Sequence, residues 1–186
     1  MSTLYQLCES CTNLADISAL ANWNVSNVTI MRAMFNNCTN LTDITALANW
    51  NVSNITTMYD MFYNCKFSDV SALANWNVSN VTNMRYVFQS CTNLTDITDL
   101  ANWNVSNVTN MYEMFWNCTK LKTLDMSGWD TGKVTDVTKF LYNCYNLTTL
   151  DMSGWDTGKV TSTTDFLYGC SKLTTWKVRH ILVLIL

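Results

Sequence analysis

The sequence predicts an α/β repeat fold, a solenoid in which about six to seven coils stack along one axis. Two residue types carry this expectation, because tryptophan and cysteine each recur at steps of 26 or 27 residues. A constant period in this range is typical of proteins whose successive coils lie on one another. The tryptophans expected to form one core column are Trp23, Trp50, Trp76, Trp103, Trp129 and Trp155. The cysteines expected to form another are Cys11, Cys38, Cys65, Cys91, Cys118, Cys144 and Cys170.

A short helix or 3-10 turn is expected before each cysteine. In the coil that ends at Cys118, the apolar residues Val108, Met111, Met114 and Phe115 are spaced as on one face of a helix. The Val-Thr segment ahead of this run could instead form a short strand, since helix and strand are hard to separate in runs this short.

One short parallel strand per coil is expected after the cysteine. The segments Leu124–Met126 and Leu150–Met152 alternate apolar and polar residues with period two, which is the strand pattern. Residues 1–175 are therefore expected to form a single solenoid domain. Residues 176–186 leave the repeat, and they are expected to form an out-of-register apolar strand or a cap.

The cysteine column favours free, buried thiols over disulfides or zinc. One cysteine per coil acts as a small apolar residue of the core, although neighbouring thiols could oxidise in pairs if their Cβ atoms pointed suitably. The additional Cys8 forms a CxxC with Cys11, but it aligns with a phenylalanine column and is interpreted as a core substitution. We expect no metal site and no cofactor.

Composition excludes several classes of protein. A hydrophobic content of 48% is typical of a folded chain and not of a disordered one, and a net charge of −3 gives little electrostatic basis for binding nucleic acid. The apolar tail Ile181–Leu186 is too short to span a membrane. The first residues lack the basic and apolar segments of a signal peptide, so neither a signal peptide nor an anchor is expected in the chain shown.

No enzyme is expected, and no catalytic residues are assigned. The single histidine, His180, stands in the tail without an evident partner. The carboxylates Asp16, Asp43, Asp69 and Asp96 recur once per coil and are interpreted as a solvated or turn-bonding column.

A candidate binding face follows from the expected helix. Residues six and two positions before each cysteine would point outward together, because they are four apart on a helix. Aromatic residues and arginine on a rigid surface are typical of interface hot spots. The alternative is that these side chains only pack over neighbouring coils. The candidate residues are Arg32, Tyr59, Tyr63, Arg85, Tyr112, Trp116, Tyr142 and Tyr168.

The repeated string W-N/D-x-S/G-N/K-V-T-x-M-x-x-M-F-x-N-C-x-x-L resembles the 26-residue repeat of bacterial surface proteins and mycoplasma lipoproteins, related to the BspA-like leucine-rich repeats. The resemblance runs from about Leu4 to Thr175 and includes Trp103, Met111 and Cys118. It implies a right-handed leucine-rich-repeat-like solenoid on a cell surface, used for adhesion or protein binding. It carries no catalytic residue over.

Two functions are therefore expected. The first is a non-enzymatic, extracellular adhesion module that binds a protein or a glycan on another cell or matrix. The alternative is a structural protein that associates end to end into oligomers or filaments through exposed coil ends. Neither function involves nucleic acid or a membrane span.

Overall fold

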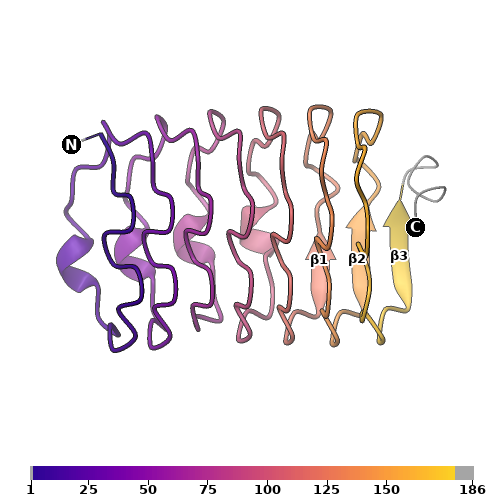
Figure 1. The fold of residues 1–186 in the computed structure, drawn as a ribbon, viewed down its shortest axis with the longest axis horizontal. Helices are drawn as coiled ribbons and strands as arrows, with labels where there is room; N and C mark the ends of the chain where they lie inside the picture. Colours follow the sequence, from indigo (N-terminus) through magenta and orange to yellow (C-terminus); the bar gives the residue numbers. More distant parts are fainter. Residues whose placement is uncertain (1, 179–186) are drawn as a thin grey trace.

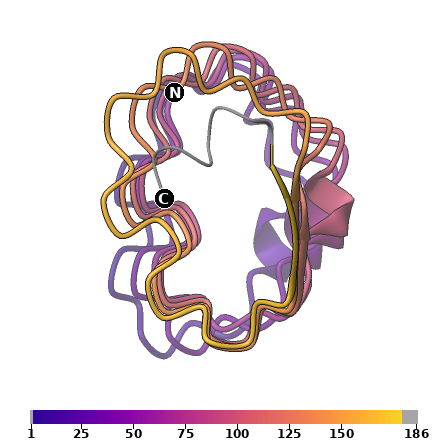
Figure 2. The same ribbon diagram turned by 90° about the vertical axis from the view of Figure 1, so that its right-hand side faces the viewer.

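The computed structural model describes residues 2–178, which wind into successive coils stacked along one axis (Figure 1). Seen along that axis, the coils superpose on a single closed outline (Figure 2). One side of the outline is indented and zigzag, and the opposite side carries the helices and strands. We call the segment from each tryptophan to the next cysteine, such as Trp103–Cys118, the zigzag arc. The segment from each cysteine to the next tryptophan, such as Cys118–Trp129, is the opposite arc.

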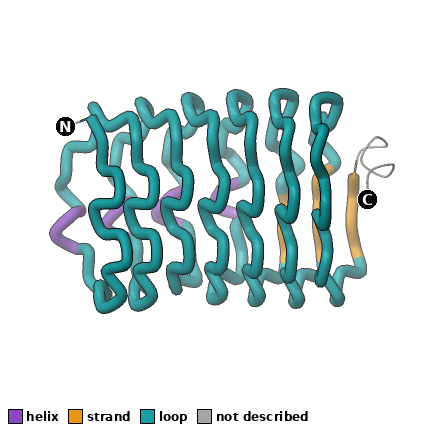
Figure 3. Tube along the Cα trace, viewed as in Figure 1, coloured by secondary structure: helices purple, strands orange, loops and turns teal. Residues whose placement is uncertain are grey.

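The opposite arc takes two forms along the stack (Figure 3). The early coils carry four short 3-10 helices: η1 Ser18–Leu20, η2 Thr45–Leu47, η3 Ser71–Leu73 and η4 Thr98–Leu100. The late coils carry three strands instead: β1 Thr123–Asp125, β2 Thr149–Met152 and β3 Thr175–Val178. The strands form one parallel sheet in the order β1-β2-β3. The strand expected in every coil is confirmed for the late coils and wrong for the early ones, where the chain closes a 3-10 turn at this point.

The repeat extends further into the tail than the sequence indicates. Trp176 pairs with Leu150, and Val178 pairs with Met152, so β3 stacks on β2 in parallel register. Trp176 therefore takes the place of a core leucine at the end of the described stack, and its side chain is 46% exposed. The tail residues His180 and Ile181–Leu186 lie outside the described residues.

The zigzag arc is not helical, and the helix expected there is wrong. Backbone N–H groups alternate between two acceptors: Met111 donates to Asp136 O of the next coil at 3.0 Å, whereas Met114 donates back to Met111 O at 3.2 Å. After each turn, a residue with positive φ interrupts the right-handed backbone, so no helix continues; examples are Glu113 at 53° and Asn117 at 60°. The bonds that reach back three residues reproduce the spacing of a helix, which is why the apolar pattern is misleading.

The strand alternative for the Val-Thr segment is seen only as single bridges between coils, not as a continuous strand. Isolated parallel bridges link one residue of each coil to the next, directly after the Val-Thr pair. The bridged residues are Thr3, Ile30, Thr57, Asn83, Asn110, Asp136 and Ser162. The threonine hydroxyls beside them bond across coils, as in Thr109 Oγ1 to Thr82 O at 3.1 Å and Thr135 Oγ1 to Thr109 O at 3.1 Å.

Tryptophan indoles tie successive coils together. The Nε1 atom of Trp103 donates to Leu73 O at 3.0 Å, and both residues are buried. The same bond recurs from each of the other buried tryptophans to the preceding coil: Trp50, Trp76, Trp129 and Trp155. Trp23 departs from the expected core column, with 42% of its side chain exposed. It lies in the first described coil, so no preceding coil covers it.

Candidate functional site

Tyrosine and arginine alternate in a row along the first five coils. We call Tyr5, Arg32, Tyr59, Arg85 and Tyr112 the Arg–Tyr ladder; each lies six residues before a cysteine. The Arg32 Cζ atom lies 5.3 Å from the ring centre of Tyr5 and 4.7 Å from that of Tyr59. The Arg85 Cζ atom lies 5.6 Å from the Tyr59 ring and 5.0 Å from the Tyr112 ring. Arg32 is thus in cation–π contact with two rings and Arg85 with three, because the Arg85 Cζ atom also lies 5.2 Å from the Tyr86 ring centre.

The backbone of the ladder is fixed on two sides. Two residues earlier in the chain, a polar side chain accepts the ladder N–H: Asn83 Oδ1 from Arg85 at 3.0 Å, and Asn110 Oδ1 from Tyr112 at 2.9 Å. The ladder carbonyl in turn accepts an N–H from the preceding coil, as Tyr112 O does from Tyr86 at 3.0 Å. At Arg85 and Tyr112 the side chains therefore start from a fixed backbone, whereas Ile30, two residues before Arg32, offers no side-chain acceptor.

Tyr86 joins the ladder, although the sequence did not indicate it. Its ring meets Tyr59 and Tyr112 edge to face, with ring centres 5.3 and 5.2 Å apart. Its hydroxyl accepts a hydrogen bond from Arg85 Nη2 at 3.2 Å. Tyr86 occupies the positive-φ column at 59°, and its position five residues before the cysteine hid it from a helical reading.

A second group of aromatic rings lies along the late coils. Trp116, Tyr142 and Tyr168, which we call the aromatic stack, each lie two residues before a cysteine. The ring centres of Trp116 and Tyr142 are 6.1 Å apart, and those of Tyr142 and Tyr168 are 4.8 Å apart, all nearly parallel. Tyr168 is 60% exposed, whereas the other two are half-buried. Tyr63 is half-buried in the same column, but it belongs to neither group in the described part of the chain.

The two groups meet at the coil that carries Glu113. This buried carboxylate accepts a hydrogen bond from Gln89 Nε2 at 2.6 Å. Its hydrogen bond with the Tyr112 side chain, together with burial, raises the pKa of Tyr112 to about 12. In the same column as Glu113 but two coils earlier, burial raises the pKa of Asp60 to about 6, against the opposing effect of Arg32 and Arg85.

A shallow groove of about 960 Å³ runs beside the first part of the ladder. Its walls come from successive coils, so it follows the axis of the stack. Ladder residues Tyr5, Arg32 and Tyr59 line one side. Threonine side chains and bridge residues line the rest: Thr3, Thr29, Ile30, Thr56, Thr57, Thr82 and Asn83.

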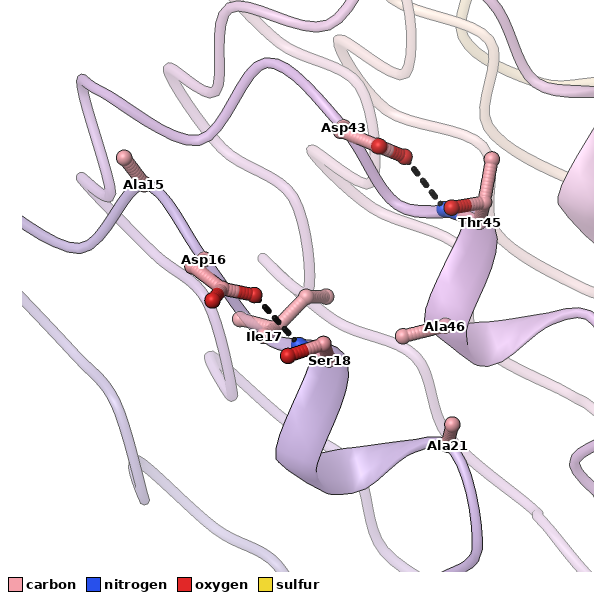
Figure 4. Close-up of a pocket in the computed structure, with 8 residues that line it drawn as sticks. All are labelled: Ala15, Asp16, Ile17, Ser18, Ala21, Asp43, Thr45 and Ala46. Atoms are coloured by element: carbon pink, nitrogen blue, oxygen red, sulfur yellow. Dashed lines mark hydrogen bonds between the residues drawn. The ribbon is translucent and has the colours of Figure 1, made fainter.

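The aspartate column on the opposite arc has a local structural role. Figure 4 shows Asp16 and Asp43 in a pocket of about 480 Å³, each bonded to its own coil. Asp16 Oδ1 accepts from Ser18 N at 2.7 Å, and Asp43 Oδ1 accepts from Thr45 N at 2.8 Å. These bonds start the 3-10 helices and lower the pKa of both carboxyls. The turn-bonding interpretation of this column is what the geometry shows.

All eight cysteines are free thiols, and the interior ones act as hydrogen-bond donors. Cys118 Sγ lies 3.1 Å from Phe88 O of the preceding coil, and Cys91 Sγ lies 3.1 Å from Phe62 O. Burial raises the pKa of Cys91 to about 12 and that of Cys118 well above its usual range. Cys11 is exposed and so departs from the expected core column, because it lies in the first described coil. Among residues 2–178, no group of three or more His, Cys, Asp and Glu side chains could hold a metal ion.

Comparison with known proteins gives a family. A sequence profile described as "Mycoplasma protein of unknown function, DUF285" matches residues 1–98 and again residues 65–180. The chain belongs to this family. The resemblance noted from the repeat is therefore confirmed, and the family description itself names no activity. A sequence search of curated proteins finds no match.

Two solved structures are similar to this DUF285 protein at a low level. One is a leucine-rich repeat protein from Eubacterium ventriosum, with 17% identity and a TM-score of 0.45 over 82% of this chain and 43% of that one. The other is a leucine-rich repeat protein from Bacteroides ovatus, with 14% identity and a TM-score of 0.39 over 96% and 64%. The chain spans less than two-thirds of the length of either, and similarities this low carry no argument about function. No helix within residues 2–178 is long and apolar enough to cross a membrane.

Proposed function

We propose that this chain is a non-enzymatic binding module of a cell surface, which attaches to a protein ligand on another cell or on extracellular matrix. The binding surface is the zigzag face, meaning the Arg–Tyr ladder, Tyr86 and the aromatic stack. The observation that carries the proposal is the contrast between interior and face. The interior columns repeat the same residues in each coil, whereas this face gathers arginine and large aromatics on a backbone held by inter-coil bonds. Such residues on a rigid support are typical of interface hot spots.

The orientation of the rings favours a protein over a glycan. Sugars stack on exposed ring faces, but the rings of Trp116 and Tyr142 lie nearly parallel, and each covers a face of its neighbour. The same holds for Tyr142 and Tyr168. What the stack presents to solvent is therefore mainly ring edges and hydroxyls, which suit hydrogen bonding to a polypeptide.

The proposal is tested by replacing Trp116, Tyr142 and Tyr168, the three residues of the aromatic stack, together by serine. Binding to immobilised matrix proteins and to a glycan array is measured for the parent and the variant. We expect protein binding to be lost while circular dichroism keeps the parent spectrum. Tyr145→Ser is the matched control, because Tyr145 is 43% exposed and lies outside both columns. Unchanged binding in the triple variant would refute a role for the aromatic stack and leave packing as its function.

End-to-end association is supported by one specific observation. The first described coil exposes Leu7 and Trp23, at 44% and 42%, in columns that are buried elsewhere. A second copy could cover these side chains in the position of a preceding coil. Light scattering at rising concentration tests this, with Trp23→Ser and a chain ending at Val178 as variants. Assembly that both variants abolish would support the structural function, and a monomer throughout would exclude it.

A further inference from the structure

We propose that the groove beside the Arg–Tyr ladder binds an acidic peptide segment in polyproline-II conformation, whose carboxylates three residues apart pair with Arg32 and Arg85. This inference rests on the proposed function and names the chemistry of the ligand.

The two arginines have no ion-pair partner. Within residues 2–178, the ion pair that forms joins Lys177 Nζ to Asp151 Oδ2 at 2.9 Å. Asp60 interacts electrostatically with both arginines and Asp136 with Arg85, yet neither carboxylate forms an ion pair with them. Burial raises the pKa of Asp60 against the attraction of the two arginines, and Glu9 raises it as well. Arg32 therefore lines the groove, Arg85 lies against Tyr59 just outside the lining, and neither guanidinium is in an ion pair.

The ring contacts decide which atoms of the arginines stay available. The rings engage each guanidinium through its charge, so the N–H groups at its edge stay as the donors for a ligand. Those edge donors match a carboxylate in the plane of the guanidinium. Arg85 uses one donor on the Tyr86 hydroxyl, and its buried Nε–H has no acceptor. Because this Nε–H is buried, the donors with which Arg85 would meet a carboxylate are those on its Nη atoms.

The spacing selects the conformation of the ligand. Both Cζ atoms contact the Tyr59 ring, and the parallel bridges Ile30–Thr57 and Thr57–Asn83 put the backbones of Arg32 and Arg85 two strand spacings, or about 9.6 Å, apart. A polyproline-II helix places residues i and i+3 on the same face at about 9.3 Å. An ordinary strand puts i and i+3 on opposite faces and i and i+2 only about 6.6 Å apart. Tyrosine-lined grooves are also the surfaces on which polyproline-II segments dock, since little entropy is lost on binding.

The walls of the groove fit the same ligand. The hydroxyls of Thr29, Thr56 and Thr82 already donate to backbone carbonyls, at 3.1 to 3.2 Å. Their methyl groups and the half-buried ring of Tyr59 then leave a mostly apolar floor, on which proline rings can pack. A polyproline-II segment has a solvated backbone without internal hydrogen bonds, so its binding requires few hydrogen-bond donors from the groove wall.

The test uses synthetic peptides and the full chain. The probe is a fluorescein-labelled dodecapeptide of four Glu-Pro-Pro units, and binding is followed by fluorescence anisotropy at 50 and 200 mM salt. We expect saturable binding that weakens with salt, and at least tenfold weaker binding for Arg32→Gln and for Arg85→Gln. Arg85→Lys keeps the charge but not the edge donors, so it should fall between the parent and Arg85→Gln. Peptides of Lys-Pro-Pro units, or with glutamates two residues apart, should bind at least tenfold more weakly than the probe.

Lys159→Gln is the matched control, since it removes one exposed positive charge away from the ladder. Equal weakening by Lys159→Gln would show unspecific charge attraction and overturn the inference, as would the absence of Glu-Pro-Pro binding. Heparin that displaces the peptide and itself depends on both arginines would replace the peptide with a polyanionic glycan, which also overturns it. Thermal unfolding midpoints of all variants within two degrees or so of the parent exclude misfolding as the cause. If the Glu-Pro-Pro peptide does not bind but matrix proteins still bind through the aromatic stack, this inference is refuted and the proposed function is retained.

Discussion

The two arcs of each coil solve the same stacking problem in different ways. Each zigzag arc has the same length, with the cysteine fifteen residues after the tryptophan, from Trp23 and Cys38 to Trp155 and Cys170. The opposite arc varies, because the tryptophan follows the cysteine by twelve residues at Trp103 but by eleven at Trp129. The constant arc bonds to its neighbours at alternate residues, whereas the early opposite arcs bond mainly within their own coil.

This difference indicates where the repeat tolerates change of length and where it tolerates change of residue. Inter-coil bonds at alternate N–H groups fix the register of the zigzag arc, so one extra residue would displace every bond after it. The side chains that leave this fixed backbone toward solvent are free to vary, and the ladder and the aromatic stack occupy those positions. The opposite arc can lose a residue, because either a 3-10 turn or a strand can connect the cysteine to the next tryptophan.

The difference in length tolerance between the two arcs is tested most directly by inserting one residue into each. A glycine between Tyr112 and Glu113 would misplace the bonds from Glu113, Phe115 and Asn117 to the next coil. The core residues of the arc would shift with them. We expect the free energy of unfolding, measured in urea, to fall by about 4 kcal/mol or more.

The matched insertion is a glycine between Ser127 and Gly128 in the opposite arc. It restores the longer form found in the early coils, so the expected loss is only about 1 kcal/mol. Equal losses from the two insertions would show that the arcs do not differ in tolerance.

A tryptophan in the middle of the stack should contribute far more to the free energy of unfolding than the one in the first described coil. Trp103→Ala removes a buried indole and its hydrogen bond to Leu73 O. The expected loss is about 3–5 kcal/mol, measured by urea unfolding. Trp23→Ala should cost less than about 1 kcal/mol, because that side chain is 42% exposed. A loss below about 1 kcal/mol for Trp103 would contradict its place in the core.

The interior thiols make the stack sensitive to alkali. Burial raises the pKa of Cys91 to about 12, whereas an unfolded thiol titrates at about 8.5. The folded state therefore keeps a proton that the unfolded state releases, so this stabilisation is complete below pH 8.5 or so and is lost as the pH rises toward 12. One thiol should account for about 2 kcal/mol of lost stability between pH 7 and 10.

Cys91→Ser provides the control, since a serine hydroxyl does not titrate in this range. Its stability should decline less steeply with pH than that of the parent, and parallel curves would rule the thiol out. Labelling with dithionitrobenzoate gives an independent check at pH 8. The exposed Cys11 should react at once, and the buried Cys65, Cys91, Cys118 and Cys144 only after unfolding.

The period of the repeat was enough to predict stacking, but not the local backbone of either arc. Turns that reach back three residues give the same apolar spacing as a helix, so Met111 and Met114 could not distinguish the two. The positive φ angles of Tyr86 and Lys139 leave no mark in the sequence, because neither residue is glycine. Asparagine is the exception: Asn117 and its equivalents tolerate the left-handed region, and their column was the available signal.

The candidate face stays a prediction, and the helix from which it was derived is absent. Residues six and two before the cysteine form the ladder and the aromatic stack through contacts between coils and not through a helical turn. Tyr5 could have been added by extending the register into the first coil. Tyr86 could not, since its contacts with Tyr59 and Tyr112 arise from neighbouring coils and a backbone angle that no periodicity reveals.

The smallest effect is expected on the early opposite arcs, where each aspartate serves only its own turn. Asp69 Oδ1 accepts from Ser71 N at 2.6 Å, and this bond lowers the pKa of the exposed carboxyl. Its stabilisation is therefore present at neutral pH and is lost as the pH falls through the lowered pKa. Asp69→Ala should cost roughly 0.5 kcal/mol at pH 7 and nothing measurable at pH 2. Asp69→Asn keeps an acceptor oxygen for the same N–H and should cost less at pH 7. If Asp69→Ala instead destabilised the protein as much as an inserted residue in the zigzag arc, the opposite arc would be as rigidly coupled as its counterpart, and the difference in length tolerance would need another cause.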